Sequence, residues 1–241
     1  SPASDDSAPE LPQVARDGAF FTTLAELFAD AAEGLQVIHA QGLVHRDVKP
    51  ANLMLTSDGE RLVGMDLGLA TSLDASAALT RAQGAAFVGS ARYAAPEQLQ
   101  SQLMQVDQRA DIYSLGATLY ELATQTPLFP SEELAELLRA KLQDDPRAPR
   151  ELDRGVPRDL DTVIQKAMAR RAEDRYATAA DLASDLRAFA AGRPIEARAP
   201  SAFDYLRLFY QRQRLLVLTS ATAVLVIVGI VVAACIRVEQ E

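Results

Sequence analysis

The stretch His45-Arg46-Asp47-Val48-Lys49-Pro50-Ala51-Asn52 decides how the rest of this sequence is interpreted. It places a carboxylate, an amine two residues later and a carboxamide three residues after that within one short segment. A carboxylate can orient a hydroxyl group, an amine can neutralise phosphate charge, and an amide oxygen is a ligand that Mg²⁺ accepts. Each residue alone is usually a surface or turn residue, but the spaced set is hard to obtain by chance.

Four further motifs follow this octet in the chain, and together the five motifs resemble one known family. Residues 20–191 resemble the C-terminal lobe of eukaryotic-like protein kinases, most closely the bacterial membrane-anchored serine/threonine kinases. The resemblance implies a mainly α fold, a helical bundle with a short β hairpin, that transfers a phosphoryl group from ATP to Ser or Thr of protein substrates. The four motifs are Val63-Gly64-Met65-Asp66-Leu67-Gly68-Leu69-Ala70, Gly89-Ser90-Ala91-Arg92-Tyr93-Ala94-Ala95-Pro96-Glu97, Asp111-Ile112-Tyr113-Ser114-Leu115-Gly116 and Ala172-Glu173-Asp174-Arg175-Tyr176.

The resemblance assigns the chemistry to four side chains. Asp47 corresponds to the base that orients the substrate hydroxyl, and Lys49 corresponds to the amine that reaches the transferring phosphate. Lys49 also indicates Ser/Thr rather than Tyr specificity. Asn52 and Asp66 correspond to the ligands of Mg²⁺, so ATP and Mg²⁺ are the expected nucleotide and cofactor.

Other motif residues have supporting roles in the family. Asp111 is expected to hold the backbone of the catalytic loop, and Ser90, where relatives usually have Thr, is expected to bond the Asp47/Lys49 pair. Glu97 and Arg175 are expected to form a buried ion pair, and loss of one partner would cost ~3–5 kcal/mol. His45 is expected to pack under Leu67, which replaces the usual Phe.

Regulation is expected in the segment between the metal motif and Ala95-Pro96-Glu97. Arg46, directly before Asp47, indicates control by phosphorylation of this segment, because a phosphate would neutralise the Arg. Thr80 is the first candidate acceptor, followed by Thr71 and Ser76.

The sequence also lacks part of a complete kinase. No G-x-G-x-x-G loop occurs in it, and Lys49 is the first lysine, so no strand lysine precedes the catalytic loop. Because the first residue is Ser, we expect a fragment of a longer protein. Because the glycine-rich loop and the strand lysine are missing from it, we expect this chain alone to bind Mg-ATP poorly or not at all and to be inactive. A non-catalytic scaffold remains the alternative. A small-molecule phosphotransferase of the aminoglycoside-kinase type shares the catalytic-loop pattern but lacks an Ala-Pro-Glu segment.

Apolar periodicity predicts the local structure. Thr23 and Glu26 form a capping-box pattern that predicts a helix start at Thr23, and Gly42 is expected to end that helix. Residues 53–55 and 61–63 read as a hairpin. Further helices are expected over 107–124, from Ser131 with Leu134, Leu137, Leu138 and Leu142 on one face, over 158–169 and over 178–191.

Residues 215–236 contain no charge and are long enough to cross the hydrocarbon layer, so they predict one transmembrane helix. Arg207, Arg212 and Arg214 precede it, which puts the kinase portion in the cytoplasm. Gly229 and neighbouring Ala residues would let two such helices pack closely, so the sequence leaves open whether the protein forms a dimer. The expected domains are a flexible leader (1–19), the kinase lobe (20–191), a juxtamembrane linker (192–214), the membrane helix (215–236) and a stub (237–241).

The amino-acid composition argues against several other kinds of partner and site. With 24 basic and 33 acidic side chains the net charge is −9, which argues against a nucleic-acid partner. Cys235 is the single cysteine and lies in the predicted membrane segment, so an internal disulfide and a Cys-based zinc site are excluded. His39 is interpreted as a helix-end residue, because His39 and His45 lack the further ligands that a zinc or haem site needs.

Overall fold

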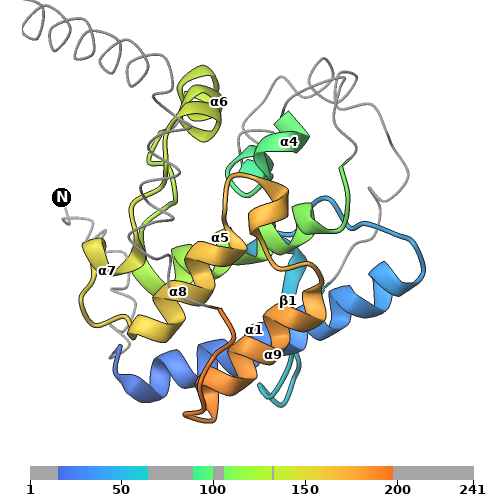
Figure 1. Cartoon of the computed structure of the whole chain (residues 1–241), viewed down its shortest axis with the longest axis vertical. Coiled ribbons are helices and arrows are strands. Elements are labelled where there is room, and N and C mark those ends of the chain that lie inside the picture. Colours follow the sequence, from blue (N-terminus) through green and yellow to red (C-terminus); the bar gives the residue numbers. More distant parts are fainter. Residues whose placement is uncertain (1–15, 65–88, 100–105, 132, 198–241) are drawn as a thin grey trace, which may run out of the picture. The chain divides into compact units, whose positions relative to one another are not determined.

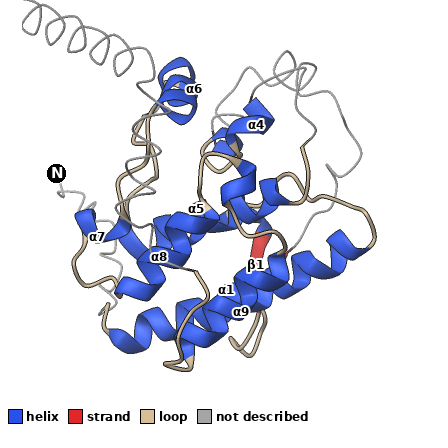
Figure 2. Cartoon of the chain, in the orientation of Figure 1, coloured by secondary structure: helices blue, strands red, loops and turns tan. Residues whose placement is uncertain are grey.

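The computed structural model describes residues 16–64, 89–99, 106–131 and 133–197. Almost all of the regular structure in this part is helical, with a single two-stranded sheet (Figure 2). The chain divides into two compact units, of which the first runs to Ala197. Its elements are α1 (Gly18–Ala40), η1 (Pro50–Asn52), β1 (Leu53–Leu55), β2 (Leu62–Gly64), α4 (Pro96–Leu99), α5 (Arg109–Thr124), α6 (Leu134–Gln143), α7 (Pro149–Leu152), α8 (Arg158–Ala167), η2 (Ala172–Asp174) and α9 (Ala179–Ala190).

The first helix begins five residues before the position predicted from the capping-box pattern, so that prediction is wrong. Asp17 is the N-cap, and its side chain accepts a hydrogen bond from the backbone N–H of Phe20. Thr23 is an exposed residue inside α1, because the apolar face already starts at the buried Phe21. The end of the helix is as predicted, since Gly42 has a φ of +73° and its N–H bonds to the carbonyl of His39.

The octet has no regular secondary structure before a single 3₁₀ turn, η1, which begins at Pro50. Proline is favoured there because its fixed φ suits the first helical position and its missing N–H has no partner to lose. The predicted hairpin follows directly, with β1 and β2 antiparallel and Met54 opposite Val63. The hairpin thus lies next to the octet and contacts α1.

Helix α5 is the central element of the unit, with nearly all of its residues buried. It packs closely against the end of α8 at Gly116, where an added Cβ would lie 2.8 Å from the Cβ of Ala167. Only glycine allows the two backbones to approach this far. The predicted helix over 107–124 is therefore confirmed to within two residues at its start.

Helices α1 and α9 lie side by side along one edge of the unit (Figure 1). Arg187 of α9 forms ion pairs with Asp30 and Glu33 of α1. Helix α9 starts with a capping box between Thr178 and Asp181, so its N-cap coincides with the predicted start at 178.

The first unit continues past the expected domain end at 191. The buried carboxylate of Asp185 accepts hydrogen bonds from the backbone N–H groups of Glu196 (2.6 Å) and Ala197 (2.7 Å), and from the hydroxyl of Tyr176 (2.9 Å). Residues 192–197 are therefore held against α9 rather than forming the start of a linker.

Within the residues that the structure describes, no helix combines the length and the apolar character that crossing a bilayer requires. The predicted membrane helix (215–236) and stub lie outside the described residues, as do most of the expected leader and juxtamembrane linker.

Candidate active site

The backbone of the octet is fixed by one carboxylate in the core. Asp111, in the first turn of α5, is fully buried and accepts hydrogen bonds from the backbone N–H groups of His45 (2.8 Å) and Arg46 (2.7 Å). Arg46 has a φ of +66°, a region that non-glycine residues rarely occupy. The two hydrogen bonds hold this strained turn, which is the role that the sequence predicted for Asp111.

The same carboxylate contacts His39, a residue whose role the sequence analysis missed. The Nε2 atom of His39 lies 2.8 Å from Oδ2 of Asp111, and both side chains are almost completely shielded from solvent. His39 therefore supports the backbone of the octet through Asp111 and also lies at the end of α1. A signal was available, because His39 lies four residues after the buried Leu35 and hence on the inner face of the helix.

The side chains of Asp47, Lys49, Asn52 and Ser90 converge. Nζ of Lys49 donates to Oδ2 of Asp47 and to Oγ of Ser90, both at 2.7 Å. Nδ2 of Asn52 donates to the carbonyl oxygen of Asp47 (2.8 Å) and to its Oδ2 (2.9 Å). The expected bond between residue 90 and the Asp47/Lys49 pair is therefore present.

This arrangement leaves particular atoms available. Both donors to the Asp47 carboxylate use Oδ2, and within the described ranges no residue donates to Oδ1. Asn52 uses its side-chain nitrogen, Nδ2, in both bonds to Asp47, so its side-chain oxygen, Oδ1, takes part in neither bond. Asp47 and Lys49 are partly exposed, with side-chain exposures of 14% and 21%, so a ligand can reach them.

A second connection between the octet and the 90–97 segment comes from Gln98, which the sequence analysis did not identify. Its Oε1 accepts from the backbone N–H of Ala95 (2.8 Å), and its Nε2 donates to the carbonyl of Arg46 (3.0 Å). A glutamine on a short helix carries no pattern that would have indicated this contact.

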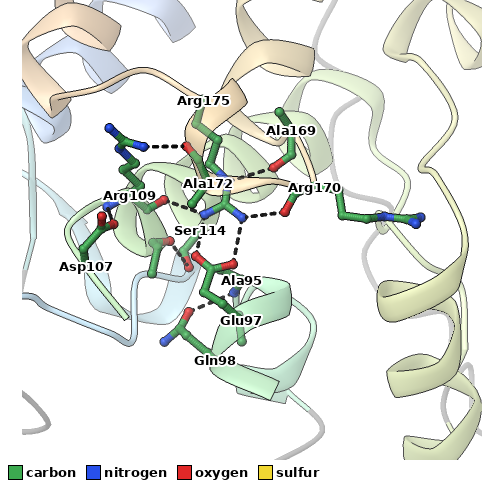
Figure 3. Close-up of polar contacts among 12 residues, drawn as sticks. Ala95, Glu97, Gln98, Asp107, Arg109, Ser114, Ala169, Arg170, Ala172 and Arg175 are labelled. Carbon is green, nitrogen blue, oxygen red and sulfur yellow. Dashed lines mark hydrogen bonds and ion pairs between the residues drawn. The ribbon is translucent and has the colours of Figure 1, made fainter. Parts of the chain in front are cut away.

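The predicted ion pair between Glu97 and Arg175 is present and is bidentate. Nη1 and Nη2 of Arg175 donate to Oε1 (2.6 Å) and Oε2 (2.8 Å) of Glu97, and the Arg side chain is fully buried. Figure 3 shows the guanidinium between this carboxylate and the backbone carbonyls of Ala169 and Arg170. With the carbonyl of Arg109 as a further acceptor, all five N–H donors of the guanidinium are used.

Tyr93, in the same segment, interacts with Glu121 of α5. Burial and a hydrogen bond to the Glu121 carboxylate both raise the pKa of the Tyr93 phenol above its usual value. The phenol therefore stays protonated at neutral pH and links the 90–97 segment to α5.

Several predicted site residues lie outside the described residues. They include Asp66 with the rest of its motif from 65 onward, and the three candidate phosphorylation sites. Among the residues described, no three His, Cys, Asp or Glu side chains form a metal-binding cluster. Of the two residues expected to hold the metal, Asn52 lies in the described part of the chain and Asp66 does not, so the metal site stays a prediction. His45 is buried as expected, but Leu67, its expected neighbour, is not described.

The α6 face also differs from the predicted one. Leu137 is buried as expected, but Leu142 is only partly buried, and the buried neighbours of Leu137 are Ala140 and Lys141. The long aliphatic stem of the lysine covers apolar surface in place of a leucine.

Comparison with known proteins adds independent information. Residues 13–186 match the model of the protein kinase domain. The chain is 40% identical over 172 residues to serine/threonine-protein kinase PknB of Mycobacterium leprae, and over 173 residues to that of Mycobacterium tuberculosis. It is 37% identical over 179 residues to probable serine/threonine-protein kinase PknB of Corynebacterium glutamicum. These alignments cover 71–72% of this chain but 27% of each relative, so the chain spans about a quarter of the length of the relatives it matches.

Proposed function

Because this chain belongs to the protein kinase domain family, we propose that it carries the catalytic loop of a serine/threonine protein kinase. The observation that carries the proposal is the convergence of Asp47, Lys49 and Asn52, with Lys49 also bonded to Ser90. The donors meet on one carboxylate oxygen, in a partly exposed position that a hydroxyl-bearing substrate can reach. A non-catalytic scaffold has no physical need for this arrangement.

In the proposed reaction, Asp47 positions the hydroxyl of a substrate Ser or Thr through its available Oδ1 and accepts the hydroxyl proton. A bond forms between the substrate oxygen and the γ-phosphorus of ATP, while the bond from that phosphorus to the bridging oxygen breaks and ADP leaves. Lys49, held by Asp47 and Ser90, is placed to neutralise charge on the transferred group.

Asn52 is suited to hold Mg²⁺, because its amide oxygen is not used in its bonds to Asp47. We assign Asp66 as the second ligand from its motif. Bound Mg²⁺ supplies positive charge that offsets the charge of the ATP phosphates.

We propose that the 241-residue chain alone transfers phosphate negligibly. Its sequence contains no glycine-rich loop and no lysine before Lys49. The hairpin beside the octet exposes the apolar side chains of Met54 (51%), Leu55 (47%) and Val63 (36%). Such a surface suits a covering element, and a nucleotide-binding lobe supplied with this chain would shield it.

We further propose that residues 215–236 anchor the protein in a membrane with the kinase portion in the cytoplasm, on the basis of their length, lack of charge and preceding arginines. Alkaline extraction of membranes tests this. The protein should stay in the pellet, and Val226→Arg together with Val228→Arg should release it. Release of the unsubstituted protein would refute the anchor.

Phosphorylation in the segment before Ser90 is proposed as the activating event, with Thr80 as the first acceptor and Arg46 as the group that the phosphate neutralises. Phosphopeptide mapping of the active full-length gene product tests it, and an unmodified Thr80 in fully active protein would contradict the assignment.

The proposed activity is tested by assaying the full-length gene product with radiolabelled ATP and casein. Phosphoamino-acid analysis should give phosphoserine or phosphothreonine. Asp47→Asn should abolish transfer, whereas Asp159→Asn, a matched change at the exposed start of α8, should leave it unchanged. Transfer that survives Asp47→Asn would refute the assigned role. No transfer to any protein would favour a scaffold, and transfer only to small molecules would indicate the other phosphotransferase class.

A further inference from the structure

Helix α6 turns a lysine into the core. Lys141 is 2% exposed, so its ammonium group and its whole stem are removed from water. Lysine is almost never fully buried unless its charge has a partner. Apolar packing of α6 explains the burial of the stem but not that of the ammonium group, so the contacts of Nζ must be considered.

The amine of Lys141 bonds to the segment next to the octet. Nζ donates to the backbone carbonyl of Ala94 at 2.5 Å. Ala94 lies between Ser90, which bonds to Lys49, and Glu97, which pairs with Arg175. Charged side chains from the rest of the unit thus hold this segment at its start, its middle and its end.

The surroundings of Lys141 contain one acid, one base and a phenol. The ring centre of Tyr113, on α5, lies 5.1 Å from Nζ and 4.9 Å from Cζ of Arg175, so the ring lies close to both cations. Glu97 of α4 favours the charged amine and Arg175 opposes it. On α6 itself, Arg139 and Glu136 contact Asp144 and Ser131 respectively at the surface.

Burial is the largest influence on this amine. It lowers the pKa of Lys141 to about 7, because Glu97 is already engaged by Arg175 and compensates the loss of water only in part. The charge on Nζ is therefore lost within the physiological pH range, whereas an exposed lysine keeps its charge there.

We propose that Lys141 is a positioning residue that tethers α6 to the 90–97 segment, and that this tether weakens when its amine loses a proton. A charged donor makes a hydrogen bond about twice as strong as a neutral one, so deprotonation loosens Ala94 while leaving the contacts at Ser90 and Glu97. The functional role of the tether rests on the proposed kinase activity, because the tethered segment contains Ser90, which bonds to Lys49. The tether itself does not depend on that activity.

Hydrogen–deuterium exchange of the full chain in mild detergent tests the tether without requiring catalysis. After correction for intrinsic rates, protection of peptides covering 89–99 should fall about fivefold between about pH 6 and about pH 8.5, as expected for weakening of a charged hydrogen bond. In Lys141→Met, protection should be low at both pH values. In Lys166→Met, a control that removes another core-facing lysine contact, the pH dependence should remain.

A direct measurement covers the case in which Lys141→Met misfolds, which loss of protection in α9 peptides would reveal. The chain has three lysines, at positions 49, 141 and 166, so ¹³C-lysine labelling gives few signals to assign. The Cε signal of Lys141 should titrate near pH 7. Titration near the usual value of a free lysine, or pH-independent protection of 89–99 in the unsubstituted chain, would overturn the proposal. Absence of phosphotransfer with an intact pH effect would instead count only against the kinase assignment.

Discussion

Arg175 and Glu97 form a two-pronged ion pair in the core although 78 residues separate them along the chain. Burial of two charges is unfavourable unless their remaining polar atoms find partners. Three backbone carbonyls accept the N–H groups of Arg175 that do not face Glu97, so this guanidinium has no unsatisfied donor. The pair thereby joins α4 to the chain that follows η2.

Arg175→Met should lower the free energy of unfolding by ~3–5 kcal/mol, because it leaves the Glu97 carboxylate and three carbonyls without their partner. Urea denaturation followed by far-ultraviolet circular dichroism measures the loss. Arg171→Met, at an exposed arginine that pairs with Glu173, should leave the free energy of unfolding nearly unchanged, because solvent screens an exposed ion pair. The double variant Glu97→Leu, Arg175→Met should recover part of the loss, and equal losses in the single and double variants would contradict this explanation.

Gly116→Ala should destabilise the chain by about 1–3 kcal/mol, because its Cβ would lie 2.8 Å from Ala167 and 3.1 Å from Met168. Gly34→Ala, on α1, is the matched control. No atom lies within 4 Å of its added Cβ, so the better helix propensity of alanine should stabilise the chain by up to about 1 kcal/mol. Thermal denaturation of both variants should show shifts of opposite sign, and a neutral Gly116→Ala would mean that α5 and α8 can separate freely.

Asp111→Asn should loosen the octet backbone, because an NH₂ group replaces one of the two acceptor oxygens and faces the N–H donor of either His45 (Oδ2) or Arg46 (Oδ1). Leaving one buried donor unsatisfied costs about 1–3 kcal/mol, so exchange of the amides at 45 and 46 should rise by about tenfold or more. Asp107→Asn changes an exposed carboxylate two residues before α5 and should leave exchange at the loop unchanged. Unaltered exchange in Asp111→Asn would remove Asp111 from the support of the loop.

The free energy of global unfolding should rise with pH above neutrality, because unfolding returns the buried Lys141 amine to water. The local loosening of Ala94 proposed for the same pH range leaves that amine buried and is a separate effect. The pKa of Lys141 is lowered from 10.5 to about 7 in the folded chain. Between these values the unfolded chain keeps the proton that the folded chain has released, so raising the pH favours the folded state. The maximum slope from this residue is ~1.4 kcal/mol per pH unit. Urea titrations from pH 7 to 10 should show this slope in the unsubstituted chain and in Lys166→Met, but not in Lys141→Met. If the slope persists in Lys141→Met, the pH dependence of stability comes from another titratable group.

The sequence could predict the parts that regular patterns or spaced motifs encode. Helices α5, α8 and α9 follow from apolar periodicity, and the contacts of Asp111, Ser90 and Glu97 follow from the family motifs. The start of α1 was missed, because two capping patterns compete near it and burial of Phe21 favours Asp17 over Thr23.

Other contacts depend on the tertiary structure and leave no local pattern. Lys141 is buried on α6, although the predicted apolar face consisted of Leu134, Leu137, Leu138 and Leu142, because a carbonyl from a distant segment lies within reach of its amine. Asp185 likewise binds N–H groups eleven and twelve residues later, beyond the predicted end of the domain. The roles of Asp66 and Thr80 remain predictions.

The hydrogen bonds to Asp111 have a consequence for the thermodynamics of ligand binding. Ordering a flexible backbone residue costs roughly 1–2 kcal/mol of conformational entropy. The strained turn at Arg46 is already ordered by a carboxylate that belongs to the core of the protein, so a ligand does not have to supply that free energy when it arrives. Calorimetry of nucleotide binding to the full-length gene product should therefore show no large entropic penalty from this loop.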